Sequence, residues 1–404
     1  MKKSNKRLIF MIILLFIIGC TPQNQAPPGN TTPDSVDELP IIEVDKIQEQ
    51  LDKMTLEEKV GQLLMVGFEG TELDDNTRKY IEDLGVGGLI FFSRNIEYKD
   101  QVTALVEDIK DISNIPLFLG IDEEGGIISR LPEEYKKLPD AIDIGNTNDV
   151  DLAFEYGKLL GNRVSSLGLN LNFAPVMDIN SNPNNPVIGK RTFGTTAKVV
   201  SEMGKQVANG IRSVNVIPCI KHFPGHGDTS TDSHIELPII NKTIEEIRNF
   251  ELIPFNSAIE EGIEMLMSAH ILIPSMDEEY PATLSKKILG DLLRNEMRYE
   301  GVVISDDMTM GAIVNNYTLE EASIDFLHAG GDIVLVCHGV NNPSLVFDEI
   351  LESVDTGELT IEELNEKVYR ILELKDRYLN EENLDLNIEE LNSKAEEIIN
   401  NLNK

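Results

Sequence analysis

The chain has 404 residues, of which 41% are hydrophobic, so it can bury a large core as one big domain or two ordinary ones. Its 70 acidic and 35 basic residues give a formal charge of −35, and a surface so negative repels nucleic acid and anionic lipid surfaces. Composition therefore argues against a nucleic-acid partner and otherwise indicates only solubility.

The first nineteen residues have the order of an export signal. The basic segment MKKSNKR precedes the apolar stretch LIFMIILLFII, which is too short for a typical membrane span. The stretch closes with IIGC at Cys20, which is similar to the lipobox of bacterial lipoproteins, in which the cysteine is lipidated and becomes the first residue after cleavage. We therefore predict a signal peptide over residues 1–19 and lipidation of Cys20. The alternative is an ordinary signal anchor in which Cys20 has no role.

Residues 20–40 read as a flexible tether, because TPQNQAPPGNTTPDSVDELP is rich in Pro, Asn, Thr and Gln and has little to bury. A tether behind a lipidated cysteine predicts an exported protein, anchored at the extracytoplasmic face of a membrane. Cys219 and Cys337 each lie inside an apolar run and are expected to be buried free thiols.

From about residue 41 short apolar runs recur, each continuous, as expected for strands that are buried on both faces. Helical patterns lie between most of them. Three begin with the spacing of a capping box, namely Thr55 with Glu58, Thr243 with Glu246, and Thr360 with Glu363. The eight runs are QLLMVGF (62–68), VGGLIFF (86–92), PLFLGID (116–122), LNLNFAPV (169–176), NVIPCIKHF (215–223), EMLMSAHI (264–271), GVVISDD (301–307) and GDIVLVCH (331–338).

Alternating strands and helices predict a parallel sheet. Eight strands over about 340 residues fit a TIM-like (β/α)8 barrel better than an open doubly wound sheet. We therefore predict a single catalytic domain over residues 41–380, followed by a short helical extension over residues 381–404. The first unit is irregular, since its strand continues directly out of a helical segment.

Polar residues stand where the predicted strands end, which in a (β/α)8 barrel is the catalytic rim. Taken singly, Asp307 is expected to be a helix N-cap before MTMGAI and His270 a satisfied core histidine. Taken together, charged groups at most strand ends predict a binding pocket. These groups are Asp122, Arg130, Asp178, Arg191, Lys221, His222, His270, Asp306, Asp307 and His338.

The segment KHFPGHGDTSTDSH, from Lys221 to His234, holds three of the six histidines of the chain. Two chemical interpretations are open: a metal site, or proton transfer and sugar binding without a metal. His222, His226 and His234 with Asp228 could supply metal ligands, but their spacing matches no standard zinc motif.

KHFPGHGDTSTDSH, GIDEEGG, NFAPVMDIN, GKRTFG, MSAHI and ISDDMTM together resemble glycoside hydrolase family 3, specifically its β-N-acetylhexosaminidase branch. The likeness extends from roughly residue 45 to 378. It implies a TIM-like barrel in which the nucleophile corresponds to Asp306 and an Asp–His acid/base pair corresponds to Asp232 and His234.

The resemblance also implies positions that hold sugar hydroxyls. The chain has no Trp, so either Phe193 or a Tyr lies beneath a sugar ring, or the site binds the sugar through polar contacts alone. The positions that match those of the family are Asp122, Arg130, Arg191, Lys221 and His222.

The expected activity is that of an exo-acting, retaining β-N-acetylglucosaminidase without a cofactor or metal. Its partner is a β-GlcNAc glycan, with cell-wall GlcNAc–MurNAc as first choice, and the protein is expected to be a monomer. The alternatives are a phosphorylase that uses the same site, a metal-dependent hydrolase, and a lipid-anchored sugar-binding protein.

Overall fold

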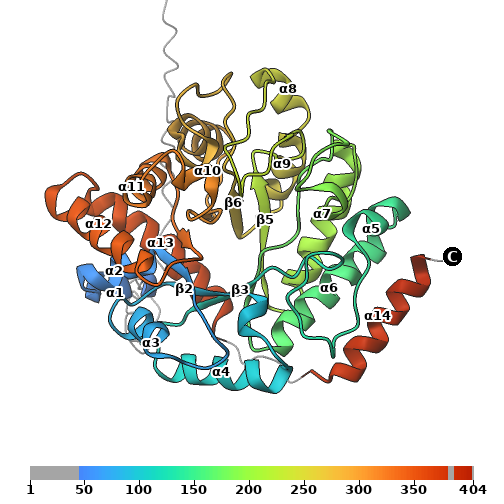
Figure 1. Cartoon of the computed structure of the whole chain (residues 1–404), viewed down its shortest axis with the longest axis horizontal. Coiled ribbons are helices and arrows are strands. Elements are labelled where there is room, and N and C mark those ends of the chain that lie inside the picture. Colours follow the sequence, from blue (N-terminus) through green and yellow to red (C-terminus); the bar gives the residue numbers. More distant parts are fainter. Residues whose placement is uncertain (1–44, 381–385, 403–404) are drawn as a thin grey trace, which may run out of the picture. The chain divides into compact units, whose positions relative to one another are not determined.

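A computed structural model describes residues 45–380 and 386–402. Cys20 and the predicted signal and tether lie outside the described residues. The described part folds around eight parallel strands with helices on the outside (Figure 1). The strands are β1 (Leu64–Gly67), β2 (Gly88–Phe91), β3 (Phe118–Ile121), β4 (Leu171–Asn172), β5 (Ile217–Phe223), β6 (Met265–Ser268), β7 (Val302–Ser305) and β8 (Val334–Val336).

The strands pair in the order β7-β6-β5-β4-β3-β2-β1-β8, and every pairing is parallel. A parallel bridge between Ile304 and Ile333 joins the two ends of this order. Backbone hydrogen bonds beside that bridge run from Ser305 to Ile333 and from Met308 to Leu335. The predicted (β/α)8 barrel is thus confirmed.

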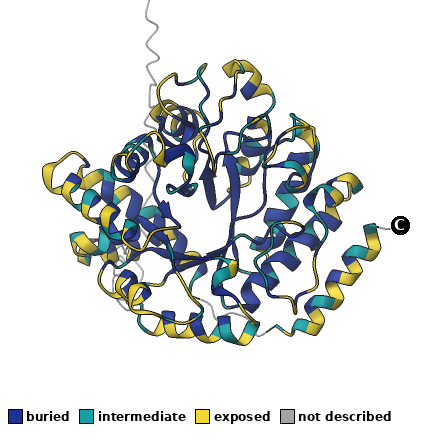
Figure 2. Ribbon diagram, viewed as in Figure 1, coloured by how far each residue is buried: buried dark blue, intermediate teal, exposed yellow. Residues whose placement is uncertain are grey.

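Long helices follow most strands and form the outer layer. Figure 2 shows the strands dark blue and the outward helix faces yellow, as expected when helices cover a buried sheet. The principal helices are α1 (Lys46–Lys53), α2 (Leu56–Gln62), α3 (Asp75–Glu82), α4 (Lys99–Asp111), α5 (Ala141–Thr147), α6 (Val150–Ser166), α7 (Ala197–Arg212), α8 (Ile244–Asn249), α9 (Leu252–Glu260), the π-helix η4 (Lys286–Glu296), α10 (Gly311–Val314), α11 (Leu319–Ala329), α12 (Asn342–Thr356), α13 (Ile361–Tyr378) and α14 (Ile388–Leu402).

The three predicted capping boxes are present. The hydroxyls of Thr55, Thr243 and Thr360 accept from the backbone three residues on, and the glutamates there return the hydrogen bond. One expected helix is broken: the segment that starts at Thr243 divides at Phe250 into α8 and α9. Pro254 explains the break, because in a continuous helix its ring would clash with the carbonyl four residues earlier.

The irregular first unit is also present, since only Leu63 separates α2 from β1. At the other end of the chain, α14 packs beside α6, with Leu391, Ala395 and Ile398 buried. Within residues 45–380 and 386–402, each helix is too short or too polar to cross a membrane.

Candidate active site

A pocket opens at the C-terminal ends of the strands, where the loops after β2, β3, β4, β5, β7 and β8 meet. It collects seven of the eight predicted catalytic and binding residues, and the eighth, Asp232, is bonded to one of them. The pocket is lined by Ile90, Phe92, Asp122, Glu124, Ile128, Arg130, Val187, Arg191, Lys221, His222, His226, Ser233, His234, Met267, Asp306, Asp307, Met310, Leu335, Cys337 and His338.

A network of charges forms one wall of the pocket. Lys221, at 2% exposure, lies 2.6 Å from Asp122 and 2.7 Å from Glu124. Glu124 also accepts two hydrogen bonds from Arg191, at 2.7 and 2.9 Å, in a bidentate pair. Arg130 lies 3.9 Å from Asp122. Opposite charges from the loop after β3, the loop after β4 and strand β5 are therefore joined within one site.

Glu124 is the member of this network that is not among the site residues predicted from the sequence. Burial alone would raise its pKa, but the charges of Arg191 and Lys221 outweigh burial and hold that pKa well below its usual range. The available signal was its position, since Glu124 follows β3 by three residues, at the same rim as Asp122.

Asp178 holds the start of the histidine-rich loop. Its buried carboxylate accepts from Nδ1 of His222 at 2.7 Å and from the backbone nitrogen of His226 at 2.6 Å. Burial opposes ionisation, yet His222 and His226 lower the pKa of Asp178 on balance. Because Nδ1 of His222 is occupied by Asp178, the Nε2 atom is the one left to act in the pocket.

His226 has partners within its own loop. Its Nδ1 lies 2.9 Å from the hydroxyl of Thr229, and its Nε2 lies 3.2 Å from that of Ser233. Burial lowers the pKa of His226 to about 4, so the ring is neutral at neutral pH. Both ring nitrogens are thus engaged in shaping the loop.

His234 differs from the other two histidines because 66% of its side chain is exposed. Its Nδ1 lies 2.8 Å from Oδ1 of Asp232. Asp232 is only partly buried. Burial raises its pKa, but the hydrogen bonds from His234 lower it on balance. The pair therefore leaves Nε2 of His234 available at the edge of the pocket.

Asp306 reaches the pocket directly from the end of β7, and its backbone nitrogen donates to the carbonyl of Ser268 on β6 at 3.1 Å. Burial opposes ionisation of its carboxyl. His270, His222 and the backbone N–H of Asp307 outweigh burial and lower the pKa of Asp306. Asp306 is therefore an ionised carboxylate at neutral pH.

Two expectations about neighbouring residues have different outcomes. His270 is a satisfied core histidine, as expected, with Nδ1 2.9 Å from the Thr283 hydroxyl and Nε2 3.0 Å from the Asp307 carbonyl. Asp307 is not the expected helix N-cap, because α10 begins after Met310. Its Oδ1 instead accepts from the backbone of Thr309 and, across the barrel closure, from that of Cys337.

The aromatic wall of the pocket also differs from expectation. Phe193 is buried in the core, at 2% exposure, and does not line the pocket. Phe92 lines it instead, stacked on His338 with ring centroids 5.8 Å apart. Cys219 and Cys337 are buried free thiols, as predicted.

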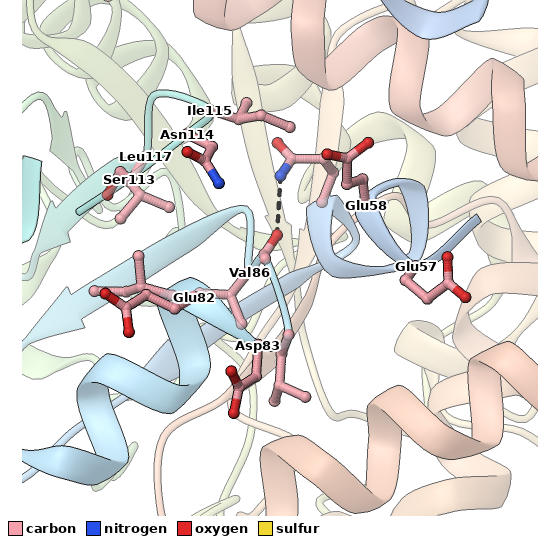
Figure 3. A pocket seen from close by; sticks show the side chains of 13 residues that line it. Glu57, Glu58, Glu82, Asp83, Val86, Ser113, Asn114, Ile115 and Leu117 are labelled. Carbon is pink, nitrogen blue, oxygen red and sulfur yellow. Dashed lines mark hydrogen bonds between the residues drawn. The ribbon is translucent and has the colours of Figure 1, made fainter. Parts of the chain in front are cut away.

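A second pocket lies at the opposite end of the barrel, before β2 and β3 (Figure 3). Its polar lining is dominated by Glu57, Glu58, Glu82 and Asp83, without a histidine or a cation. In the described ranges no group of three or more His, Cys, Asp or Glu side chains is arranged as a metal site.

Residues 55–374 match the model of the glycosyl hydrolase family 3 N-terminal domain. A β-hexosaminidase of Thiobacillus denitrificans is 35% identical over 298 residues, which cover 72% of this chain and 81% of the relative. A family 3 β-N-acetylglucosaminidase from Paenibacillus superposes with a TM-score of 0.82 at 38% identity, over 85% of this chain and 68% of that one. A β-glucoside phosphorylase superposes with a TM-score of 0.80 at 25% identity, over 87% and 66% of the two chains.

Proposed function

The chain belongs to glycosyl hydrolase family 3 and is a glycoside hydrolase of the hexosaminidase type, and from that premise we propose that it is an exo-acting, retaining β-N-acetylglucosaminidase. It removes terminal β-linked GlcNAc. The observation that carries the proposal is a single pocket lined by Asp306, directly after β7, and by His234 of the β5 loop, whose ring is paired with Asp232.

The first step forms a bond between a carboxylate oxygen of Asp306 and the anomeric carbon while the bond to the leaving oxygen breaks. Nε2–H of His234 gives its proton to that oxygen, so the aglycone leaves as a neutral alcohol. Asp232 orients the ring through Nδ1 and stabilises the imidazolium, as aspartate does in a Ser-His-Asp triad.

The second step reverses these roles. Neutral His234 takes a proton from a water molecule, whose oxygen attacks the anomeric carbon and releases the carboxylate of Asp306. Two inversions give retention of configuration at the anomeric carbon.

The charged wall binds the sugar in this proposal. Asp122, Glu124 and the Nε2 atom of His222 supply acceptors or donors for ring hydroxyls. Lys221, Arg130 and Arg191 supply donors. Because the charges of this wall are already paired with one another, the sugar meets a preorganised surface whose side chains do not have to reorganise on binding.

We expect a cell-wall GlcNAc–MurNAc glycan to be the substrate, because an exported, membrane-anchored enzyme of this branch lies next to the cell wall. The proposal therefore includes lipidation of Cys20 and a monomeric enzyme at the extracytoplasmic face. In membrane fractionation, Cys20→Ala should move the protein to the soluble fraction with its specific activity unchanged. Retention of that variant in the membrane would refute the anchor.

Turnover of a chromogenic β-GlcNAc glycoside with and without EDTA tests the reaction class. We expect turnover that the chelator leaves unchanged, and GlcNAc as the product. Turnover abolished by EDTA would indicate the metal-dependent hydrolase, and binding without turnover would indicate a sugar-binding protein.

A separate question is whether water or phosphate attacks the anomeric carbon in the second step. A histidine acid/base is compatible with either, and the chain is similar to a β-glucoside phosphorylase. Products formed in phosphate buffer and in phosphate-free buffer should both be GlcNAc. GlcNAc 1-phosphate in the first buffer alone would identify a phosphorylase.

A further inference from the structure

The loop that carries His234 is held by the segment that carries Asp306. Three consecutive carbonyls of the loop accept hydrogen bonds from α10 and from Asn315, its C-cap residue. The backbone nitrogen of Ala312 donates to Ser233 at 3.1 Å, and that of Gly311 donates to His234 at 3.3 Å. The side-chain amide of Asn315 donates to Ile235 at 3.0 Å.

The two backbone donors are free to do this because a helix leaves its first N–H groups without partners inside the helix. Gly311 also sets the distance of approach. A Cβ atom added there would lie 2.6 Å from the carbonyl oxygen of Ile235 and 2.7 Å from that of His234. The backbone angles of Gly311 are ones that other residues adopt, so the requirement for glycine is one of space alone.

The side chains of His234 and Ile235 contribute little packing of their own, whereas Ser233 is 2% exposed and its hydroxyl lies 3.2 Å from Nε2 of His226. The side chain of His234 is 66% exposed, and Ile235 is 65% exposed. The bonds to α10 therefore hold the loop backbone at His234, while Asp232 orients the ring and His226 contacts the neighbouring Ser233.

We infer that Gly311, Ala312 and Asn315 form a latch that positions the acid/base histidine. The latch lies five to nine residues after Asp306 in the chain, so one segment places the nucleophile and holds the proton donor relative to it. Gly311 and Asn315 are positioning residues, since they act through His234. The inference rests on the proposed function.

Leaving-group dependence tests the latch, because a misplaced acid matters most when the departing oxygen is basic. Gly311→Ala and Asn315→Ala should each lower kcat/KM on the β-1,4-linked GlcNAc disaccharide by about tenfold, the effect of losing about one hydrogen bond. On 4-nitrophenyl β-GlcNAc, whose leaving group departs unaided, the loss should stay below about twofold.

Asn316→Ala is the matched control. Asn316 is also exposed, but its amide donates to Ala312 within the same turn and not to the loop. Hydrogen exchange supplies a readout that is independent of activity: amides of residues 230–236 should exchange faster in Gly311→Ala and Asn315→Ala than in Asn316→Ala. If Gly311→Ala fails to fold, Asn315→Ala carries the test.

The latch is wrong if both variants behave like Asn316→Ala, or if they lose activity equally on both substrates. Failure of the proposed function would look different. His234→Ala would then itself show no dependence on the leaving group, while the exchange measurement would still report whether α10 holds the loop.

Discussion

The backbone nitrogen of Asp307 donates a hydrogen bond to Oδ1 of Asp306 at 2.9 Å, and the two adjacent carboxylates have different surroundings. The carboxylate of Asp306 enters the pocket, where His270 and His222 favour its ionised form. That of Asp307 accepts from the backbone of Thr309 and Cys337 and from the Thr309 hydroxyl, so its oxygens are occupied by the protein.

Asp306→Ala should therefore lower kcat by several orders of magnitude with the fold intact, because the covalent step loses its nucleophile. A 2-fluoro or 5-fluoro glycosyl inhibitor followed by peptide mapping should find the label on Asp306. Asp307→Ala should instead lower the melting temperature, since it leaves buried backbone donors without an acceptor. Label on Asp307, Asp122 or Asp178 would overturn the assignment.

His234→Ala should nearly abolish hydrolysis of a β-GlcNAc disaccharide and spare much of the first step on a nitrophenyl glycoside. The reason is that only the disaccharide needs a proton for its leaving oxygen. Asp232→Ala should show the same pattern, because the carboxylate orients the His234 ring.

His226→Ala serves as the comparison for the two preceding variants. His226 holds Thr229 and Ser233, so its loss should weaken turnover of both substrates alike. Steady-state kinetics of the three variants on the disaccharide and on the nitrophenyl glycoside measure this difference. An equal loss on both substrates in His234→Ala, or its rescue by added zinc, would remove the proton-donor role.

Glu124→Gln should raise KM and lower the melting temperature. The change removes the negative charge that pairs with both Arg191 and Lys221. Arg191 then loses its carboxylate partner, and Lys221 keeps only Asp122. Breaking a buried ion pair in this way costs about 3–5 kcal/mol. Thermal unfolding and kinetics on one sample measure both effects. Unchanged values of both would show that Glu124 neither binds sugar nor supports the wall.

Lys375 should make the protein less stable as the pH falls from about 10 towards 7. Its ammonium group is buried and lies 2.6 Å from Oε1 of Gln62, a residue that lines the second pocket, and burial lowers the pKa of Lys375 from 10.5 to about 7. The folded state thus binds fewer protons than the unfolded state between these two values. The contribution to stability is complete above pH 10.5 and is lost as the pH falls to about 7.

Lys375→Met removes this titration. In denaturant unfolding at pH 7 and pH 9.5, the increase in the free energy of unfolding on going to the higher pH should be smaller in the variant than in the parent protein. An identical increase in both would show that Lys375 is not the titrating group.

Local features of the sequence determined the architecture. Continuous apolar runs and threonine capping boxes depend on neighbours within a few residues, so eight strands and three helix starts could be predicted from the chain alone. The position of a polar residue at or directly after the end of a strand likewise predicted that Asp122, Lys221 and Asp306 share one rim.

The partners of those residues were decided only by the tertiary structure. Glu124 meets Arg191 across 67 residues, Asp178 meets His222 across 44, and Asn315 meets Ile235 across 80. The same holds for Asp307, which follows β7. It was expected to cap a helix, but its carboxylate accepts a hydrogen bond from the backbone of Cys337, after β8. A buried polar group takes whichever donor or acceptor the closed barrel brings within hydrogen-bonding distance, and that choice depends on closure of the sheet more than on the neighbouring sequence.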